Sequence, residues 1–327
     1  MSRYLLVSDI HASERPPSSC TDRYWPDLLG LLKQTVKVAH TTAGVIAVVW
    51  AGDVFHSKAP ARVSHRLVQQ LIEVIRSYPV PVFIVPGNHD LRNDRLDSIH
   101  ETQPLGVLLQ AGARLLDGWG GYDAEYQYFI YGVPWQQEWN PDRVRETLAP
   151  YRQQVFMSGT GSKRCLVVTH APLYPPGKEL EYEYYPAQQW AQDMGGEDGY
   201  CYYGHVHEPH GVWECGGVTF CNNGALSRGS LHEYNLTRQV GCTIWDDLSG
   251  EFEFVPLDAP PASEVFRLTE KQQVTDMQGR LDSFLEDIGA TQLAALSPDS
   301  VIAHIRSLGL GSDVEALAAE LLGEAQC

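Results

Sequence analysis

The sequence lacks the features that mark membrane-spanning and secreted proteins. No apolar run approaches the ~18 residues that a membrane helix needs, and the first residues lead into a strand-like stretch without the apolar region of a signal peptide. The 7 cysteines are scattered and include no Cys-x-x-Cys pair, so neither a zinc ribbon nor a disulfide framework is indicated. We therefore expect a cytoplasmic protein with reduced thiols and no contact with a membrane.

Basic residues are also few. The 327 residues include 24 Lys and Arg against 41 Asp and Glu, which gives a formal net charge of −17. Because neutralisation of phosphates by Lys and Arg supplies most of the affinity for nucleic acids, a chain this acidic is not expected to hold duplex DNA on a broad surface of its own. Its 43% of hydrophobic residues is nevertheless enough apolar material for a packed core.

Short apolar runs alternate with helical patterns through the first two-thirds of the chain, which is typical of an α/β fold. The predicted strands, the last two of which form a closing hairpin, are residues 4–8, 45–51, 82–85, 128–133, 165–169, 200–203, 218–221, 241–245 and 251–255. The predicted helices are residues 25–39, 63–77 and 104–110.

The composition changes at the break Asp258-Ala259-Pro260-Pro261, which predicts one domain over residues 1–257 and a linker with a helical tail over 258–327. The tail is acidic, because residues 262–327 contain 11 acidic and 4 basic residues. Its first predicted helix begins at the capping box of Thr269 and Gln272 and carries a heptad-like apolar stripe. Two interpretations stay open, a cap folded onto the main domain and a segment that docks a partner.

Five segments of the chain end in residue types that bind metal ions, and each follows a strand-like run. They are Asp9-Ile10-His11, Gly52-Asp53, Gly87-Asn88-His89-Asp90, Thr169-His170 and Gly204-His205-Val206-His207. In α/β sheets the functional residues gather at the carboxyl ends of strands, so these segments are expected to meet. In an extended chain, residues two apart point the same way, so Asp9 and His11 can face one ion, as can His205 and His207.

The mixture of carboxylate, amide and imidazole groups suits Mn, Fe or Zn better than Mg or Ca. Seven ligand-type residues favour two ions that share one carboxylate, as in two-metal phosphoryl transfer. A lone histidine at a strand end is usually structural, whereas five such segments in one chain are hard to reach by chance. The residues alone therefore predict a binuclear metal-dependent hydrolase.

Together the five segments, which span residues 9–207, resemble the complete motif set of the calcineurin-like metallophosphoesterases. Within that superfamily, the string Ala51-Gly52-Asp53-Val54-Phe55-His56 and the string Val85-Pro86-Gly87-Asn88-His89-Asp90 resemble the SbcD-type DNA double-strand-break repair nucleases. Phe55-His56 is the informative part, because these nucleases place a second active-site histidine there. The resemblance implies a sandwich of two mixed β-sheets flanked by helices, followed here by a small α-helical tail.

The resemblance also implies a role for each site residue. The implied metal ligands are Asp9, His11 and His207 for one ion, Asn88, His170 and His205 for the other, and Asp53 as the bridge. His89 would protonate the leaving oxygen or stabilise charge on the phosphate, Asp90 would orient its imidazole, and His56 would position the phosphodiester. Two divalent ions are expected, Mn first, with Fe or Zn as alternatives.

One departure from the family concerns the turn after the last strand of the site. The family often has a Pro-Gly-Ser turn there, and this chain has Asn222-Asn223-Gly224-Ala225, which keeps a glycine for the turn. In the loop that follows, Arg228 is a candidate phosphate contact. A solvated loop arginine is the equally open alternative.

The leading hypothesis is an SbcD-like exonuclease or endonuclease that processes DNA with an SbcC-like ATPase. The tail is shorter than the DNA-capping domain of full-length family members, and the ATPase, docked on the tail helices, would supply the basic surface that this chain lacks. A homodimer is also consistent with the family. The alternative is a stand-alone phosphodiesterase that acts on a nucleotide or another small diester; the acidic charge favours it, while Phe55-His56 and the tail favour the nuclease.

Overall fold

The computed structural model describes residues 2–121, 128–157, 164–177, 184–196 and 198–268. The chain divides into two units, Met1–Arg267 and Leu268–Cys327. The tail helices predicted after residue 268 lie outside the described residues, so the division into domains stays a prediction. Within the described residues, no helix is long and apolar enough to cross a membrane.

The first sheet is mixed and has the strand order β13-β12-β1-β2-β3-β4. Its strands are β1 (Arg3–Val7), β2 (Val45–Ala51), β3 (Val82–Val85), β4 (Arg114–Leu115), β12 (Gly241–Asp246) and β13 (Phe252–Pro256). β1 pairs in parallel with β2 and antiparallel with β12, and β12 and β13 form the predicted hairpin. β2 lies at the centre and is buried along almost its whole length, as its unbroken apolar sequence VIAVVWA requires.

The second sheet is also mixed, with the order β10-β11-β9-β6-β5. Its strands are β5 (Ile130–Val133), β6 (Leu166–His170), β9 (Gly199–Gly204), β10 (Gly211–Cys215) and β11 (Val218–Asn222). Only β10 pairs antiparallel, with β11. The short strands β7 (Leu173–Tyr174) and β8 (Tyr185–Pro186) form a separate parallel pair.

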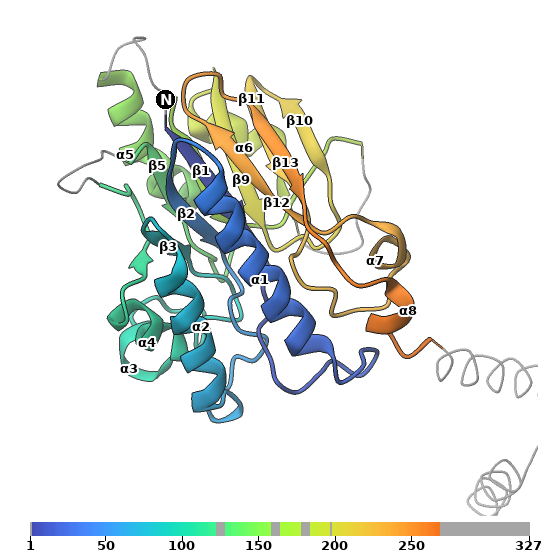
Figure 1. Cartoon of the computed structure of the whole chain (residues 1–327). Coiled ribbons are helices and arrows are strands. Elements are labelled where there is room, and N and C mark those ends of the chain that lie inside the picture. The colour runs from blue at the N-terminus through green and yellow to red at the C-terminus, as the bar shows by residue number, and fades with distance from the viewer. Residues whose placement is uncertain (1, 122–127, 158–163, 178–183, 197, 269–327) are drawn as a thin grey trace, which may run out of the picture. The chain divides into compact units, whose positions relative to one another are not determined.

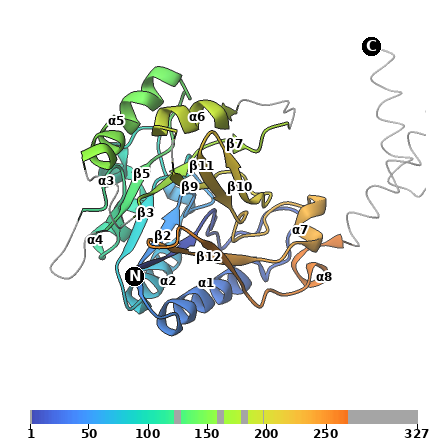
Figure 2. The same ribbon diagram turned by 90° about the horizontal axis from the view of Figure 1, so that it is seen from above.

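Helices cover the outer face of each sheet (Figures 1 and 2). The helices of the described residues are α1 (Tyr24–Thr41), α2 (His65–Ser77), α3 (Ser98–Thr102), α4 (Pro104–Gln110), α5 (Pro141–Met157), α6 (Ala187–Met194), α7 (Glu233–Thr237), α8 (Ala262–Val265) and the 3-10 turn η1 (Pro60–Arg62). The helices α1 and α2 lie on the first sheet, and α5 and α6 lie on the second.

The main core fills the space between the two sheets. Side chains of the first sheet, such as Leu6 and Val49, join one buried cluster with side chains of the second sheet, such as Val168 and Tyr202. Burial of these apolar faces drives the sheets together. The predicted α/β fold, a sandwich of two mixed sheets flanked by helices, is therefore confirmed for the described residues.

Candidate metal centre

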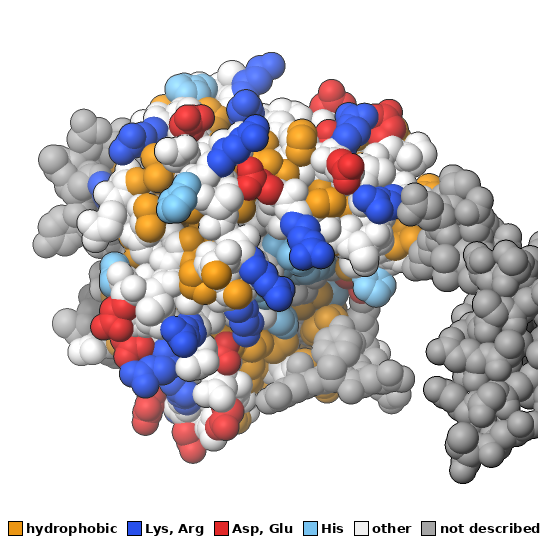
Figure 3. Space-filling view, turned by 90° about the horizontal axis from the view of Figure 1, so that it is seen from below, with side chains coloured by type: hydrophobic (Ala, Val, Ile, Leu, Met, Phe, Trp, Pro, Cys, Tyr) orange, Lys and Arg blue, Asp and Glu red, His pale blue; other side chains and the backbone are white. Residues whose placement is uncertain are grey.

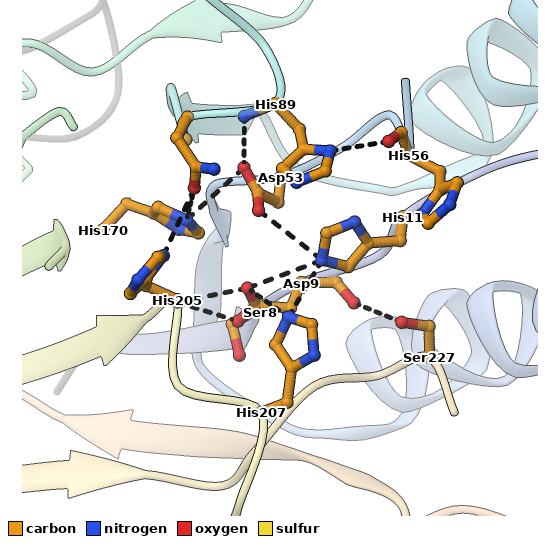
Figure 4. A network of polar contacts seen from close by, with 12 residues as sticks. Ser8, Asp9, His11, Asp53, His56, His89, His170, His205, His207 and Ser227 are labelled. Atoms are coloured by element: carbon orange, nitrogen blue, oxygen red, sulfur yellow. Dashed lines mark hydrogen bonds and ion pairs between the residues drawn. The ribbon is translucent and has the colours of Figure 1, made fainter. Parts of the chain in front are cut away.

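The five predicted segments meet at one edge of the sandwich, where β1, β2, β3, β6 and β9 all end. Figure 4 shows the labelled side chains from these strand ends pointing toward a common centre. The residues brought together are Asp9, His11, Asp53, Asn88, His89, His170, His205 and His207. The sequence prediction that these segments share one site is thus matched by their positions.

The ligand-type atoms fall into two groups. In the first group, His11 Nε2 lies 3.0 Å from His207 Nε2, and His207 Nε2 lies 3.5 Å from Asp9 Oδ1. In the second, Asn88 Oδ1 lies 3.2 Å from both His170 Nε2 and His205 Nδ1. Two donor sets of this kind are what two neighbouring cations would require.

Asp53 lies between the groups and presents one oxygen to each. Its Oδ2 is 3.5 Å from His11 Nε2, and its Oδ1 is 3.4 Å from His170 Nε2. The backbone amide of His89 donates to Oδ1 at 2.8 Å and fixes the carboxylate in this orientation. Asp53 therefore has the position of a bridging ligand (Figure 4).

The backbone is strained at these positions. Asp9, His11, Asp53 and His205 all have positive φ, at 53°, 49°, 49° and 79°. The left-handed region costs non-glycine residues on the order of 1 kcal/mol or more, and such residues cluster at functional sites. The expectation of an extended chain at Asp9–His11 and His205–His207 is accordingly wrong, and His205 and His207 contact different groups of ligands.

Three glycines of the motifs let other strands come this close. A Cβ on Gly52 would overlap the imidazole of His170, and one on Gly87 would overlap the backbone and carboxylate of Asp53. A Cβ on Gly204 would collide with the carbonyl of Ala51 at the end of β2. The glycines are therefore part of the site, because they set the spacing of its ligands.

The charge balance of the cluster fits cations. Asp9 and Asp53 are 0% and 2% exposed, and their ion partners among the described residues are histidines alone, with no Lys or Arg. Burial opposes ionisation of Asp53, but the charge and hydrogen bond of His170 hold its pKa well below the usual range. Two buried carboxylates without a permanent positive partner are costly, and metal ions would supply that charge.

Two of the four imidazoles in the ligand groups are neutral without metal, whereas Asp53 and Asp9 outweigh burial and raise the pKa of His170 to about 9, so a bound ion would displace that proton. Burial lowers the pKa of His11 to about 3 and that of His205 to about 4, so both rings are neutral at pH 7 with a lone pair available. His170 Nδ1 donates to the carbonyl of Ala51 at 2.8 Å, which turns Nε2 toward Asn88 and Asp53. The donor set therefore fits two divalent ions.

The comparisons with known proteins agree with this geometry. The chain matches the family model described as calcineurin-like phosphoesterase over residues 2–209. The chain belongs to this family. Calcineurin-like phosphoesterases are metal-dependent hydrolases that use two metal ions, so the family and the cluster of ligands lead to the same coarse conclusion.

Among curated proteins, the chain is similar to the DNA double-strand break repair protein Mre11 of Archaeoglobus fulgidus, at 28% identity over 193 residues. The match covers 57% of this chain and 42% of that protein, so the chain spans less than half of the relative's length. Two solved 5'-nucleotidases also match. The precursor from Thermus thermophilus has a TM-score of 0.44 at 12% identity over 87% of this chain and 59% of its own. The enzyme from Candida albicans has a TM-score of 0.44 at 14% identity over 78% of this chain and 52% of its own.

His89 and His56 line the centre on one side. Their rings stack with centroids 6.0 Å apart, and each also contacts the ring of His11. His89 Nδ1 donates to the backbone carbonyl of His56 at 2.6 Å, which leaves Nε2 as the nitrogen that can exchange a proton. The phosphoesterase centre therefore has two further imidazoles besides those of its ligand groups.

The predicted role of Asp90 needs a correction. Asp90 was expected to orient His89, yet the structure gives that contact to the His56 carbonyl. The buried Asp90 carboxylate accepts instead from the backbone amides of Val54, Phe55 and Gly87 at 3.0–3.2 Å. It therefore ties the loop after β3 to the loop after β2, and acts on loop geometry rather than on the imidazole.

Arg228 also differs from its prediction as a phosphate contact. Its side chain is 8% exposed, and its guanidinium donates to the carbonyl of Pro260. Arg228 therefore anchors the segment that leads to α8 rather than facing the ligands. Its neighbour Ser227 does reach the site, since its hydroxyl donates to the carbonyl of Asp9 at 3.0 Å.

Trp135 is a site residue that the sequence reasoning missed. Its ring lies 4.8 Å from that of His205 and 6.2 Å from that of His170. The residue follows β5, and β5 runs parallel to β6 and ends at the same edge of the sheet. The shared edge of the sheet could have indicated Trp135 from the sequence. It was overlooked because an apolar side chain is not a metal-ligand type.

Proposed function

We propose that the chain hydrolyses phosphodiester bonds with two divalent ions, Mn by preference. Asp9, His11 and His207 would hold one ion, Asn88, His170 and His205 would hold the other, and Asp53 would bridge them. The support for this assignment is the division of the donor atoms into two groups on either side of Asp53.

Bound ions would supply Lewis-acid polarisation of the phosphoryl oxygens and would lower the pKa of a coordinated water. The chain's own residues supply the rest. His89 gives a proton to the leaving oxygen through Nε2, because its Nδ1 is already committed to the His56 carbonyl. The His56 imidazole, 5.6 Å from His11 and stacked with His89, holds the phosphodiester beside that proton donor.

The substrate that we favour is DNA, and the observation that carries this choice is local charge. Residues 54–72, which follow the bridging carboxylate, include Lys58, Arg62 and Arg66 and no acidic residue, and two of the three pair with acids elsewhere, Lys58 with Asp94 and Arg66 with Glu14. Arg92 lies on the neighbouring loop after β3. Figure 3 shows Lys and Arg side chains gathered beside the histidines on this face. Phosphate contacts need such a patch next to the site rather than a basic protein as a whole.

The exposure of the ligands also suits a polymer. The His207 side chain is 35% exposed, and His89 and His205 are partly exposed, so the centre is open on the side away from the sheets. A chain of nucleotides can cross an open site. The acidic tail after residue 268 would dock an SbcC-like ATPase, and a homodimer formed by helices after the second and third motifs would place two such sites together.

The alternative is a stand-alone phosphodiesterase for a nucleotide or another small diester. The net charge of −17 favours it, because the protein as a whole repels polyanions. The two functions share the metal centre. They differ in whether the basic residues of the loops after β2 and β3 contribute to catalysis.

The test compares Mn-supported cleavage of end-labelled linear duplex and single-stranded DNA with hydrolysis of a chromogenic bis-aryl phosphodiester. His89→Ala should lower both activities by about 10² to 10⁴, as expected for loss of a general acid. Arg62→Glu should lower DNA cleavage and reduce its salt dependence, while hydrolysis of the small diester stays unchanged.

The matched control is Arg76→Glu, an exposed arginine in the last turn of α2, at the opposite edge of the sheet from the ligands. It reverses the same charge and should leave both activities unchanged. Diester hydrolysis without DNA cleavage, in the presence of an SbcC-like ATPase as well as in its absence, would favour the stand-alone enzyme.

A further inference from the structure

The turn that carries Asp9 and His11 is held in a conformation that it would not adopt alone. Both residues have positive φ, which costs each of them conformational energy. In glycine this conformation would cost little, but Asp9 and His11 must also aim their side chains at one ion. The surrounding structure therefore has to impose the turn.

On one side the turn is fixed by backbone hydrogen bonds to the loop after β2. The amide of Asp9 donates to the carbonyl of Gly52 at 3.2 Å, and the amide of His11 donates to the carbonyl of Asp53 at 2.8 Å. These contacts leave the carbonyls of Asp9 and His11 to be bound from elsewhere.

On the other side, two side-chain hydroxyls bind those carbonyls. Ser227 Oγ donates to the Asp9 carbonyl at 3.0 Å (Figure 4), and the Tyr24 phenol donates to the His11 carbonyl at 2.9 Å. The backbone amide of Ser227 also donates to the Asp9 carbonyl, at 3.3 Å, and this contact stays when the hydroxyl is removed. Both residues are almost fully buried, at 4% exposure each.

We propose that Tyr24 and Ser227 are positioning residues of the metal centre, which hold the Asp9–His11 turn in its ligand geometry before an ion arrives. Tyr24 is the first residue of α1, so it connects the turn to a long helix packed on the sheet. Neither residue touches a ligand atom, and both act through the backbone of the ligands. The inference rests on the metal centre proposed above.

The test measures Mn²⁺ binding to the metal-free full-length chain by titration calorimetry for the wild type, Tyr24→Phe and Ser227→Ala. Each variant removes one hydroxyl and should weaken binding of one of the two ions about tenfold, the loss typical of residues that orient ligands. Binding of the ion at Asn88, His170 and His205 should stay as in the wild type. Hydrolysis of the bis-aryl diester should return to the wild-type rate at saturating Mn²⁺.

The matched control is Tyr78→Phe. Its phenol is also buried and hydrogen-bonds to Thr35 Oγ1 at 2.6 Å, at the far end of α2 from the site. The chemical change is the same, so a loss of metal affinity that Tyr78→Phe does not share belongs to the contact with the turn. If Tyr24→Phe fails to fold, the Mn²⁺ affinity of Ser227→Ala alone tests the inference.

Wild-type affinity for both ions in folded Tyr24→Phe and Ser227→Ala would overturn the inference and leave the proposed function standing. An activity loss that high Mn²⁺ does not restore would also overturn it, since it would indicate general damage. Absence of Mn²⁺ binding by the wild type would overturn the metal centre itself and the inference with it.

Discussion

Gly87 determines how closely the loop after β3 approaches the bridging carboxylate. A Cβ at this position would overlap the backbone nitrogen and the carboxylate of Asp53, and the carboxylate cannot move without breaking its hydrogen bond from the His89 amide. The glycine is therefore required because its lack of a side chain leaves room for the Asp53 ligand, and not because it makes the loop flexible.

Gly87→Ala is accordingly expected to lower the free energy of unfolding by about 2 kcal/mol through overpacking. It should also weaken Mn²⁺ binding by at least about tenfold, because Asp53 is displaced. Urea unfolding and calorimetric titration measure the two effects.

Gly30→Ala is the control, because Gly30 lies within α1 with nothing within 4 Å of its Cβ position. That variant should gain about 1 kcal/mol from helix propensity with unchanged binding. Wild-type metal affinity in Gly87→Ala would contradict the packing argument.

The elements that carry the site could be predicted from the sequence because they are the most buried ones. β2 and β6 are largely apolar runs covered on both faces. A ligand residue ends β6 and another follows β2 by two residues, so pattern and chemistry coincide. Helix α5 was not predicted. It contains Pro150 in its interior, and an internal proline normally argues against a helix. Strand β10 was also missed, because it is an edge strand with both faces largely exposed.

The conformations of the ligand turns could not be predicted at all. Positive φ at Asp9 and His11 is imposed by hydrogen bonds with distant segments, to the carbonyls of the loop after β2 and from the hydroxyl of Ser227. Local sequence favours an extended chain at such positions. The sequence therefore predicted which segments meet, and tertiary contacts determine which of their side chains face each other.

The hairpin of β12 and β13 depends on one carboxylate. Asp246 accepts from the amides of Leu248 and Ser249 at 3.0 and 3.2 Å, and from Arg3 Nε at 3.1 Å on the neighbouring strand. Burial opposes ionisation, but these donors hold the pKa of Asp246 below its usual value. A depressed folded-state pKa contributes stability above the unfolded-state value of about 3.9, and that stability is lost as the pH falls through the folded pKa.

Asp246→Asn is therefore expected to cost about 1 kcal/mol at pH 6, where the wild-type carboxylate is ionised. The difference from the wild type should stay constant from pH 6 down to about 4 and narrow as the pH falls further toward about 2, because protonation of Asp246 then removes the same advantage. Urea unfolding across this range measures it. A difference that stays constant with pH would show that the hydrogen bonds, and not the charge, carry the effect.

At the scale of the whole molecule, the metal centre joins the two sheets. Asp9 and Asp53 follow strands of the first sheet, whereas His170 and His205 come from strands of the second. Asp53 and His170 would hold an ion at the edge where the chain places buried carboxylates close together, and that ion would link the two halves of the sandwich. The free energy of metal binding becomes free energy of folding, since the unfolded chain has no such arrangement of ligands.

Removal of metal is therefore expected to destabilise the fold. A ligand at 100 times its dissociation constant stabilises the native state by about 2.7 kcal/mol, so two ions should raise the melting temperature by roughly 10 °C over the chelated protein. Thermal unfolding in EDTA and in excess Mn²⁺ measures the difference.

Asp53→Asn should remove most of this difference in melting temperature, because that carboxylate contacts both ligand groups. Asp94→Asn should retain the difference, because it changes a carboxylate on the loop after β3 that pairs with Lys58. Equal melting temperatures with and without Mn²⁺ in the wild type would contradict an ion between the sheets and leave the buried carboxylates to be stabilised by histidine protons alone.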